Sequence, residues 1–380
     1  MDNSTEMAKN IFTITHLTSA HRRYDTRIFI KMCRSLSLNG YNVSLVVADG
    51  KGDEAKNGLS IIDVGLKTSG RFFRMTTSVK KIFEKAKELD SDIYHFHDPE
   101  LMPAGLKLKN LGKKVIFDIH ENTDLQILEK DWIPLIFRKL TAYIYSKYEN
   151  YACKKYDLII VPQEAMHKKY DKLSKTVVIS NFPNKDHKLN LKLKKLNKYN
   201  LLYTGAITES RGLFNMLNLI EELNLLDNKY KLTLAGVISP DLLKKLKSHI
   251  GWEFTEYLGQ LSQEDIQEIY EKNSIGLILF NNVGQYFMAY SLKLFEYMQN
   301  GMFVVMPNFG DWINFNNSFN VGINVNTTDS KMIAKQIHTL NKEQMTQIGE
   351  DNIQKVEKYF SWDSQEIKLF KTYNEVINVK

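Results

Sequence analysis

The chain has 380 residues, 43% hydrophobic and 25% charged, with a formal net charge of +7. Its length predicts two domains, and its two distant cysteines, Cys33 and Cys153, exclude a disulfide framework and a cysteine zinc site. No run of about 18 consecutive apolar residues occurs and the first residues do not resemble a secretory signal, so the sequence predicts a cytoplasmic protein without a membrane-spanning helix.

The first half alternates short apolar or β-branched runs with helical patterns, which is typical of repeated βαβ units and mostly parallel sheets. Asp25 is a candidate N-cap of the first helix, which should end at Asn39-Gly40. We expect strands near residues 11–15, 42–48, 60–64, 92–97, 114–119, 158–162 and 177–181. Residues 1–184 are therefore predicted to form one Rossmann-like domain.

The same pattern restarts after a lysine-rich stretch, residues 185–199, that is predicted to be an interdomain linker. We expect further strands at 200–205, 231–235, 254–258, 275–280, 303–307 and 321–325. Residues 200–358 would form a second Rossmann-like domain, and 359–380 a C-terminal helix that could pack back on the first domain. The predicted fold is α/β, with two such domains facing across a cleft at the carboxyl ends of their strands.

The segment Ser291–Gly301 places a lysine and a glutamate one turn apart at the start of a short helix. Ser291 is a candidate N-cap, so Lys293 would lie in the first turn, where free backbone N–H groups and the helix dipole favour anions. Glu296 would share that face and could accept hydrogen bonds from ribose or sugar hydroxyls. An ordinary amphipathic helix with solvated charges would show the same pattern, and the segment alone does not separate the two.

A second cationic motif, Leu202–Gly212, follows the first strand of the second half. Gly205 permits close approach of a ligand to the backbone, and Arg211 could bind a phosphate through two hydrogen bonds. The alternative is a surface loop with an exposed arginine. At the ends of neighbouring strands, Arg211 and Lys293 would form one cationic pocket.

Histidines and carboxylates gather at the ends of two strands of the first half, at His95, His97, Asp98, Glu100, His120 and Glu121. They could bind a metal, because the spacing of His95 and His97 puts both side chains on one side of their strand. We favour the alternative in which one of these histidines is buried and structural and Asp98-Pro99 begins the next helix. The triplet Asp90-Ser-Asp92, which resembles a metal-binding signature, precedes its strand and is predicted to be a turn.

Five motifs follow one another in an order shared with a known family: His21–Phe29, Tyr94–Leu101, Asp118–Asn122, Tyr203–Gly205 with Arg211-Gly212, and Lys293–Gly301. Together they resemble the retaining, nucleotide-sugar-dependent glycosyltransferases of the two-Rossmann-domain (GT-B) type, in the group called family 4. The resemblance covers essentially the whole chain. It implies a nucleotide-sugar donor held by the second domain, an acceptor held mainly by the first, and transfer with retained anomeric configuration.

The resemblance also implies roles for single residues at the donor. Glu296 matches the glutamate that usually holds the nucleotide ribose, and Lys293 and Arg211 match the basic residues that balance the leaving diphosphate. Gly205 lies in the same donor site, and His120 matches the histidine that hydrogen-bonds the transferred sugar. Preorganised cations can stabilise a departing diphosphate without an enzyme-bound metal, so no metal or other cofactor is expected.

Two positions depart from the family pattern. The family's first motif glutamate, which usually contacts the transferred sugar, should lie eight residues before Glu296, where this chain has Met288. The loop Asn281–Tyr286 could supply that contact instead. The first loop, Thr15–Ala20, lacks the paired glycines common in the family.

The expected acceptor side is basic and partly aromatic. Its candidate acceptor-binding residues lie around the first helix and the second histidine motif, and they are His21, Arg22, Arg23, Arg27 and His97. Residues 134–148 mix aromatics, aliphatics and lysines, which suits either a helix in an anionic membrane interface or a core-packed helix with solvated lysines. A saccharide linked to polyprenyl diphosphate would give both features a purpose, with arginines at the diphosphate and the helix at the inner leaflet.

These features predict a retaining glycosyltransferase that moves a hexose or N-acetylhexosamine from a nucleotide sugar, expected to be UDP-linked, to a lipid-linked saccharide. The setting would be bacterial O-antigen, lipopolysaccharide or capsule synthesis, on the cytoplasmic face of the inner membrane. No aromatic platform or recognition helix supports nucleic-acid binding. Two alternatives stay open: a UDP-N-acetylglucosamine epimerase of the same fold, and a nucleotide-sugar-binding protein without catalysis, which is suggested by Met288.

Overall fold

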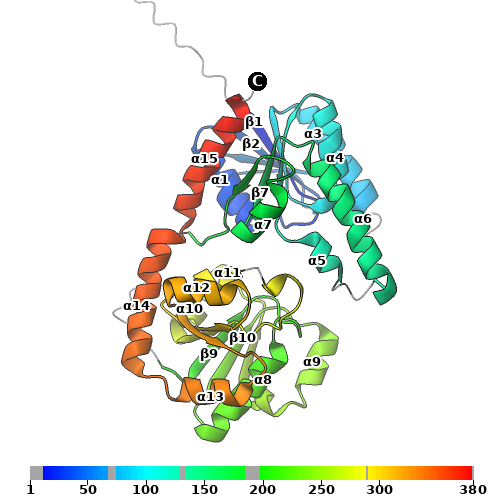
Figure 1. The fold of residues 1–380 in the computed structure, drawn as a ribbon. Helices are drawn as coiled ribbons and strands as arrows, with labels where there is room; N and C mark the ends of the chain where they lie inside the picture. The colour runs from blue at the N-terminus through cyan, green and yellow to red at the C-terminus, as the bar shows by residue number, and fades with distance from the viewer. Residues whose placement is uncertain are drawn as a thin grey trace, which may run out of the picture. The chain divides into compact units, whose positions relative to one another are not determined.

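The computed structural model describes residues 12–66, 74–128, 130, 133–184, 197–287 and 290–378. The chain divides into two compact units, the first made of Met1–Asn181 with Gln365–Lys380 and the second of Phe182–Ser364 (Figure 1). Most of the predicted linker 185–199, and all of Met288, lie outside the described residues. No helix in the ranges given above is long and apolar enough to cross a membrane.

The first unit is built on an eight-stranded sheet with the order β3-β4-β2-β1-β5-β6-β7-β8, parallel except for the edge pair β3 and β4. Its strands are β1 (Thr13–Leu17), β2 (Asn42–Val47), β3 (Glu54–Lys56), β4 (Leu59–Asp63), β5 (Ile93–Phe96), β6 (Lys114–Asp118), β7 (Leu158–Val161) and β8 (Thr176–Val178). Each strand expected in the first half is present. The sequence pattern does not predict β3, because its three residues include two charged ones and no apolar alternation.

The helices of the first unit cover both faces of this sheet. They are η1 (Thr26–Cys33), α1 (Arg34–Leu38), η2 (Arg74–Ser78), α3 (Val79–Leu89), η3 (Pro99–Leu101), α4 (Met102–Asn110), α5 (Thr123–Leu128), α6 (Leu135–Cys153) and α7 (Glu164–Tyr170). Tyr94 and Phe96 of β5 point into a core shared with α3 and α4. His95 alternates to the other face and contacts Tyr373 of the C-terminal helix α15 (Trp362–Asn378).

Two predicted features of the first unit are confirmed. Asp25 caps the first helical segment, since its Oδ1 accepts from the backbone N–H groups of Arg27 and Ile28 at 2.8 and 3.0 Å. From Gln365 onward, α15 belongs to the first unit, so the C-terminal helix packs back on the first domain. Figure 1 shows it along the opposite side of the sheet from α3 and α4.

The second unit contains a six-stranded parallel sheet with the order β11-β10-β9-β12-β13-β14. Its strands are β9 (Asn200–Thr204), β10 (Lys231–Ala235), β11 (Thr255–Gly259), β12 (Ile275–Leu277), β13 (Phe303–Pro307) and β14 (Gly322–Val325), all at expected positions. The helical segments are α8 (Leu213–Leu226), α9 (Pro240–Leu246), η5 (Ile250–Phe254), α10 (Gln263–Lys272), η6 (Gly284–Phe287), α11 (Leu292–Gln299), α12 (Asp311–Phe319), α13 (Ser330–His338) and α14 (Lys342–Tyr359).

Helix α14 holds the turn that follows α11. Gly349 lies so close to this turn that an added Cβ would be 2.3 Å from the Gly301 carbonyl oxygen. One turn later, Asn352 donates through Nδ2 to the carbonyl oxygens of Met302 and Val321, both at 3.0 Å. These contacts fix the end of α11 against β13, and α11 carries the predicted residues Lys293 and Glu296.

We expect Gly349→Ala to lower the free energy of unfolding by about 1–3 kcal/mol, because its methyl group would press on the Gly301 carbonyl. Helix propensity alone predicts the opposite sign, a gain of about 1 kcal/mol. Urea unfolding followed by circular dichroism measures the difference. Glu350→Ala, on the exposed side of the same helix, is the control, and a stabilised Gly349→Ala protein would contradict the close packing.

Candidate functional site

In the second unit, basic side chains gather at the carboxyl edge of the sheet, where the neighbouring strands β9 and β12 end. Gly205 follows β9 with φ +107°, and a Cβ there would lie 3.5 Å from Lys293 Nζ of α11. Arg211 lies in the loop after β9 and is close enough for its charge to lower the pKa of Lys293. The structure therefore brings the predicted residues Gly205, Arg211 and Lys293 together, and we call them the cationic cluster.

Lys293 is only 5% exposed. Its Nζ donates to Ser291 Oγ at 3.0 Å and lies 4.9 and 5.1 Å from the ring centres of Tyr203 and Phe280. Ser291 occupies the N-cap position, but its side chain caps no backbone N–H of α11. The described helix α11 therefore lacks the expected capping hydrogen bond, because the Ser291 hydroxyl accepts from Lys293 instead.

In the described part of the chain, the charges of the cationic cluster are not balanced by ion pairs with carboxylates. Burial and the charge of Arg211 lower the pKa of Lys293 to about 7, and Glu296 acts in the opposite direction. Among the described residues, neither Lys293 nor Arg211 forms an ion pair; their hydrogen bonds go to hydroxyl and carbonyl oxygens. A buried ammonium beside a second cation is costly unless an anion offsets it. The cluster therefore suits a phosphate or diphosphate.

Tyrosines position the other polar groups of this site. Glu296, one turn after Lys293, accepts from Tyr270 Oη at 2.9 Å, and Tyr270 also bonds to Thr204 at the end of β9. Arg211 Nε donates to Tyr286 Oη at 3.2 Å. Tyr270 could not be recognised from the sequence, because a single tyrosine in an amphipathic helix belongs to no motif.

The loop Asn281–Tyr286 is tied to the loop that carries Arg211. The backbone N–H of Asn281 donates to Ser210 O at 3.0 Å, and its Nδ2 donates to Glu209 O at 2.8 Å. This loop therefore borders the cationic cluster, as a sugar contact in place of a glutamate would require. Since Met288 lies outside the described residues, it stays a prediction that this loop supplies the sugar contact in place of that glutamate.

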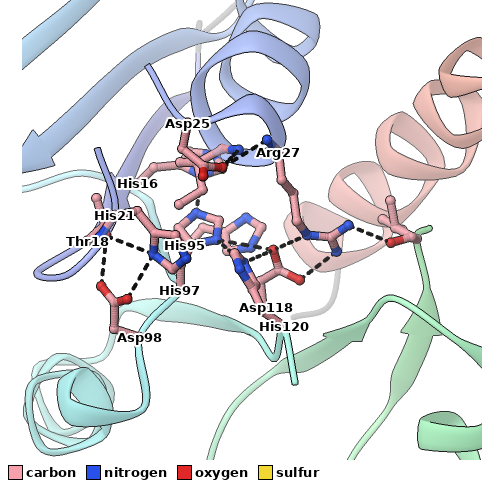
Figure 2. Close-up of polar contacts among 12 residues, drawn as sticks. His16, Thr18, His21, Asp25, Arg27, His95, His97, Asp98, Asp118 and His120 are labelled. Carbon is pink, nitrogen blue, oxygen red and sulfur yellow. Dashed lines mark hydrogen bonds and ion pairs between the residues drawn. The ribbon is translucent and has the colours of Figure 1, made fainter. Parts of the chain in front are cut away.

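At the carboxyl edge of the first unit's sheet, two histidines each bond to a buried aspartate (Figure 2). His21 Nδ1 lies 2.9 Å from Asp98 Oδ1, and His120 Nε2 lies 3.0 Å from Asp118 Oδ2. The two imidazole rings are 4.8 Å apart, and their side chains remain 28% and 19% exposed. Both histidines can therefore meet a ligand while their carboxylate partners hold them in place.

Asp98 shapes the loop that lacks the family's glycines. Its Oδ2 accepts from Thr18 Oγ1 and from the backbone N–H groups of Ser19 and Ala20, at 2.7, 2.6 and 3.1 Å. Burial alone would raise the pKa of Asp98, but His21 and these donors hold it well below its ordinary value. Burial lowers the pKa of His21, yet Asp98 outweighs this effect and the net shift is upward. His21 is thereby favoured as a cation.

The structure corrects the acceptor-binding prediction for Arg23 and Arg27, because both are buried and paired inside the first unit. Arg23 bonds to Asp49 and Glu54. Arg27 donates to both oxygens of Asp118 at 2.9 and 2.7 Å and to a backbone carbonyl. They hold the scaffold together and do not face a ligand.

The same correction applies to His97, which is buried with both ring nitrogens in hydrogen bonds. Arg22 is exposed, so it and His21 remain candidates for the acceptor. Two other predictions agree with the structure. Asp98-Pro99 begins the next helical segment, and Asp92 accepts from Thr13 at the amino end of β1, away from both histidines.

Two described groups have the donor types and spacing of metal sites: His16 with His95 and His97, and His97 with Asp118 and His120. In the second group the three atoms already lie 3.0 to 3.2 Å from one another, and both histidines hydrogen-bond to the Asp118 carboxylate. Arg27 also balances the charge of Asp118. Hydrogen bonding therefore accounts for the arrangement, and the absence of a metal requirement stays a prediction.

Lys293→Met should raise the free energy of unfolding by about 1–3 kcal/mol at pH 6, because it removes a buried charge and keeps the side-chain length. The pKa of Lys293 falls from 10.5 to about 7 on folding, so between these values the unfolded chain binds more protons and wild-type stability rises with pH. The gain should therefore be largest below pH 7 and shrink toward pH 10. Urea unfolding at several pH values measures it.

Lys331→Met, at an exposed position of α13, controls for the substitution itself. A Lys293→Met protein that is less stable than wild type at pH 6 would indicate that the folded protein already neutralises this ammonium.

Comparisons with known proteins match both halves of the chain to glycosyltransferase families. The model of glycosyltransferase family 4 matches residues 26–186, and a glycosyl transferase-like model matches residues 215–369. No curated protein sequence matches the chain.

Several solved structures share the fold over nearly the whole chain. Sucrose-phosphate synthase from Thermosynechococcus elongatus is 14% identical, with a TM-score of 0.73 and coverage of 96% of this chain and 99% of that one. A glycosyltransferase from Rickettsia africae is 17% identical, with a TM-score of 0.69 and coverage of 98% and 100%. Anabaena HepE, in complex with UDP and glucose, is 12% identical, with a TM-score of 0.70 and coverage of 96% and 100%. The two family models identify the chain as a glycosyltransferase of the family 4 type, and these likenesses show that it has the GT-B fold.

Proposed function

We propose that this glycosyltransferase moves a hexose or N-acetylhexosamine from a UDP-linked sugar to a saccharide on polyprenyl diphosphate. The product would be used in bacterial O-antigen, lipopolysaccharide or capsule synthesis, and the enzyme would work at the cytoplasmic face of the inner membrane. No metal cofactor is included in the proposal. The catalytic residues are His120, Arg211 and Lys293, and the donor also meets Gly205 and Glu296.

The observation that carries the donor assignment is the unbalanced charge of the cationic cluster. When a nucleoside diphosphate leaves, negative charge develops on its oxygens, and fixed cations stabilise it without reorganisation. Lys293, with a pKa of about 7, would be fully protonated once a diphosphate lies beside it. Glu296, held by Tyr270, is placed to accept from ribose hydroxyls. The UDP in the HepE complex supports the choice of base.

In the first unit, His21 and His120, whose side chains are partly exposed, would meet the substrates. His120 would hydrogen-bond the transferred sugar, while Asp118 fixes the ring through Nε2 and leaves Nδ1 for the ligand. His21 as a cation and the exposed Arg22 would bind the diphosphate of the acceptor. Asp98 keeps His21 oriented for this contact.

The lipid-linked acceptor is supported by the outer face of α6. Eight large apolar or aromatic side chains of this helix are exposed, with Ile136 reaching 81%: Leu135, Ile136, Phe137, Leu140, Tyr143, Ile144, Tyr148 and Tyr151. Its buried side contains Ala142, Ala152 and Cys153. Four exposed lysines lie on the helix or just after it: Lys139, Lys147, Lys154 and Lys155. An apolar face edged by lysines suits the interface of an anionic membrane.

None of the three solved structures named above is described as acting on a lipid-linked acceptor. The acceptor assignment therefore rests on α6. The other interpretation of residues 134–148 is a core-packed helix with solvated lysines. Such a helix would bury the apolar side chains that are exposed on α6.

The donor assignment predicts two distinct kinetic effects. Arg211→Ala should lower kcat by about 10²–10³-fold, because a preorganised charge is lost in the transition state. Glu296→Ala should raise the Kd for UDP about ten- to hundredfold, because a charged hydrogen bond is lost. Calorimetry with UDP and transfer of a labelled sugar to extracted lipid-linked saccharides measure these values. Lys331→Ala is the control for general effects of removing a charge.

Other results would contradict parts of this proposal. Wild-type activity in both variants would reject the site, and a new free sugar formed from the donor alone would indicate the epimerase. Donor binding without turnover on any acceptor would indicate a binding protein. Transfer that EDTA abolishes and manganese restores would contradict the expected metal independence.

The exposed face of α6 should bind vesicles that contain phosphatidylglycerol in preference to pure phosphatidylcholine vesicles. The triple variant Ile136→Ser, Leu140→Ser, Ile144→Ser should weaken this binding about a hundredfold, at roughly 1 kcal/mol for each half-inserted side chain. Cosedimentation measures binding. The matched control is Leu225→Ser, Leu226→Ser, Ile367→Ser, which changes exposed apolar side chains of α8 and α15. Equal loss in both triple variants would reject α6 as the membrane face.

A further inference from the structure

A continuous line of hydrogen bonds joins Asp118 to the C-terminal helix α15. His97 Nδ1 lies 3.1 Å from Asp118 Oδ2, and His97 Nε2 lies 2.9 Å from His16 Nδ1. His16 Nε2 lies 3.3 Å from Tyr373 Oη, which lies 2.6 Å from His95 Nδ1. All five side chains are buried. We call this set the histidine chain.

The direction of each hydrogen bond follows from Asp118. Burial alone would raise the pKa of Asp118, but Arg27 and His120 hold it well below its ordinary value, so the carboxylate only accepts. His97 Nδ1 must therefore donate to it. Burial lowers the pKa of His97 to about 4, so the ring is neutral and carries one proton. Its Nε2 is then an acceptor and takes its hydrogen bond from His16 Nδ1.

The directions of the hydrogen bonds at Tyr373 follow in the same way. Burial lowers the pKa of His16 well below its ordinary value, so His16 is also neutral and its Nε2 must accept. The donor is Tyr373 Oη, whose pKa burial raises, so the hydroxyl keeps its proton. Tyr373 in turn accepts from His95 Nδ1. His95 Nε2, which has no partner among the described residues, then carries the lone pair at the end of the chain.

We propose that Tyr373 is a positioning residue that fixes the tautomers of His16 and His97 and so determines which group receives the proton of His120. His120 Nε2 lies 3.0 Å from Asp118 Oδ2 and 3.2 Å from His97 Nδ1. While His97 Nδ1 carries a proton, it cannot accept, so His120 donates to Asp118 alone. Asp118 favours this tautomer at one end of the histidine chain, and the tyrosine hydroxyl favours it at the other. Without that hydroxyl, the lone pair of His16 Nε2 is buried with no donor, so the other tautomers of His16 and His97 become populated and His97 competes for the proton of His120.

This inference depends on the proposed function for one point only, that His120 contacts substrate. Its structural part concerns tautomers, which can be measured without any substrate. A failed glycosyltransferase assay would therefore reject the proposed function and leave the tautomer measurement to decide the inference.

The test uses the full chain with ¹⁵N-labelled histidine, and long-range ¹H–¹⁵N spectra that distinguish the two neutral tautomers. We expect His16, His95 and His97 of the wild type in the Nδ1–H form at pH 7. Tyr373→Phe should give mixed tautomers at His16 and His97. The matched control is Tyr41→Phe, since the hydroxyl of Tyr41 also bonds to α15, at Asn374 and outside the histidine chain.

In the transfer assay, Tyr373→Phe should lower kcat about ten- to hundredfold with an unchanged KM for the donor, whose site lies in the second unit. Tyr41→Phe should behave as wild type. An Nε2–H tautomer of His97 in the wild type would overturn the proposal even if the variant failed to fold. Unchanged tautomers in a folded Tyr373→Phe protein, or equal effects of both variants, would also overturn it.

Discussion

The buried ion pair of Arg27 and Asp118 is the constraint on which the site of the first unit depends. The carboxylate of Asp118 at the end of β6 has no access to water, and it stays charged because the guanidinium from η1 bonds both of its oxygens and His120 lies beside it. Once charged, it accepts further hydrogen bonds from the histidines around it. The helix, the strand end and the partly exposed His120 are thereby held in one arrangement.

The second unit has the opposite electrostatics. The first unit buries anions and neutralises them internally, whereas the second buries Lys293 beside Arg211, and neither of these two cations forms an ion pair with a described carboxylate. The first arrangement is rigid and preorganised. The second lowers the free energy of unfolding, and binding of an anionic ligand can restore it. This destabilising charge lies on α11, and α14 holds the end of that helix in place through Gly349 and Asn352.

The sequence predicts the strands and the proximity of Gly205, Arg211 and Lys293 well, because both depend on local pattern. Alternating apolar runs mark each parallel strand, and motifs at strand ends must meet at one edge of a sheet. Burial of Arg23 and Arg27 could not be predicted, nor could it be predicted that His97 would be a buried histidine of its motif, since their carboxylate partners lie 21 to 91 residues away in the chain. Tyr373 is 357 residues from His16, and nothing near it indicates this contact.

The exposed face of α6 has a consequence for the protein in bulk water. Several large apolar side chains on one helix form a surface that two copies can bury against each other when no lipid covers it. Such pairing strengthens with protein concentration and with salt, because salt screens the lysines that would otherwise keep the two faces apart. We therefore expect the oligomeric state of the purified protein to depend on whether detergent or lipid covers α6.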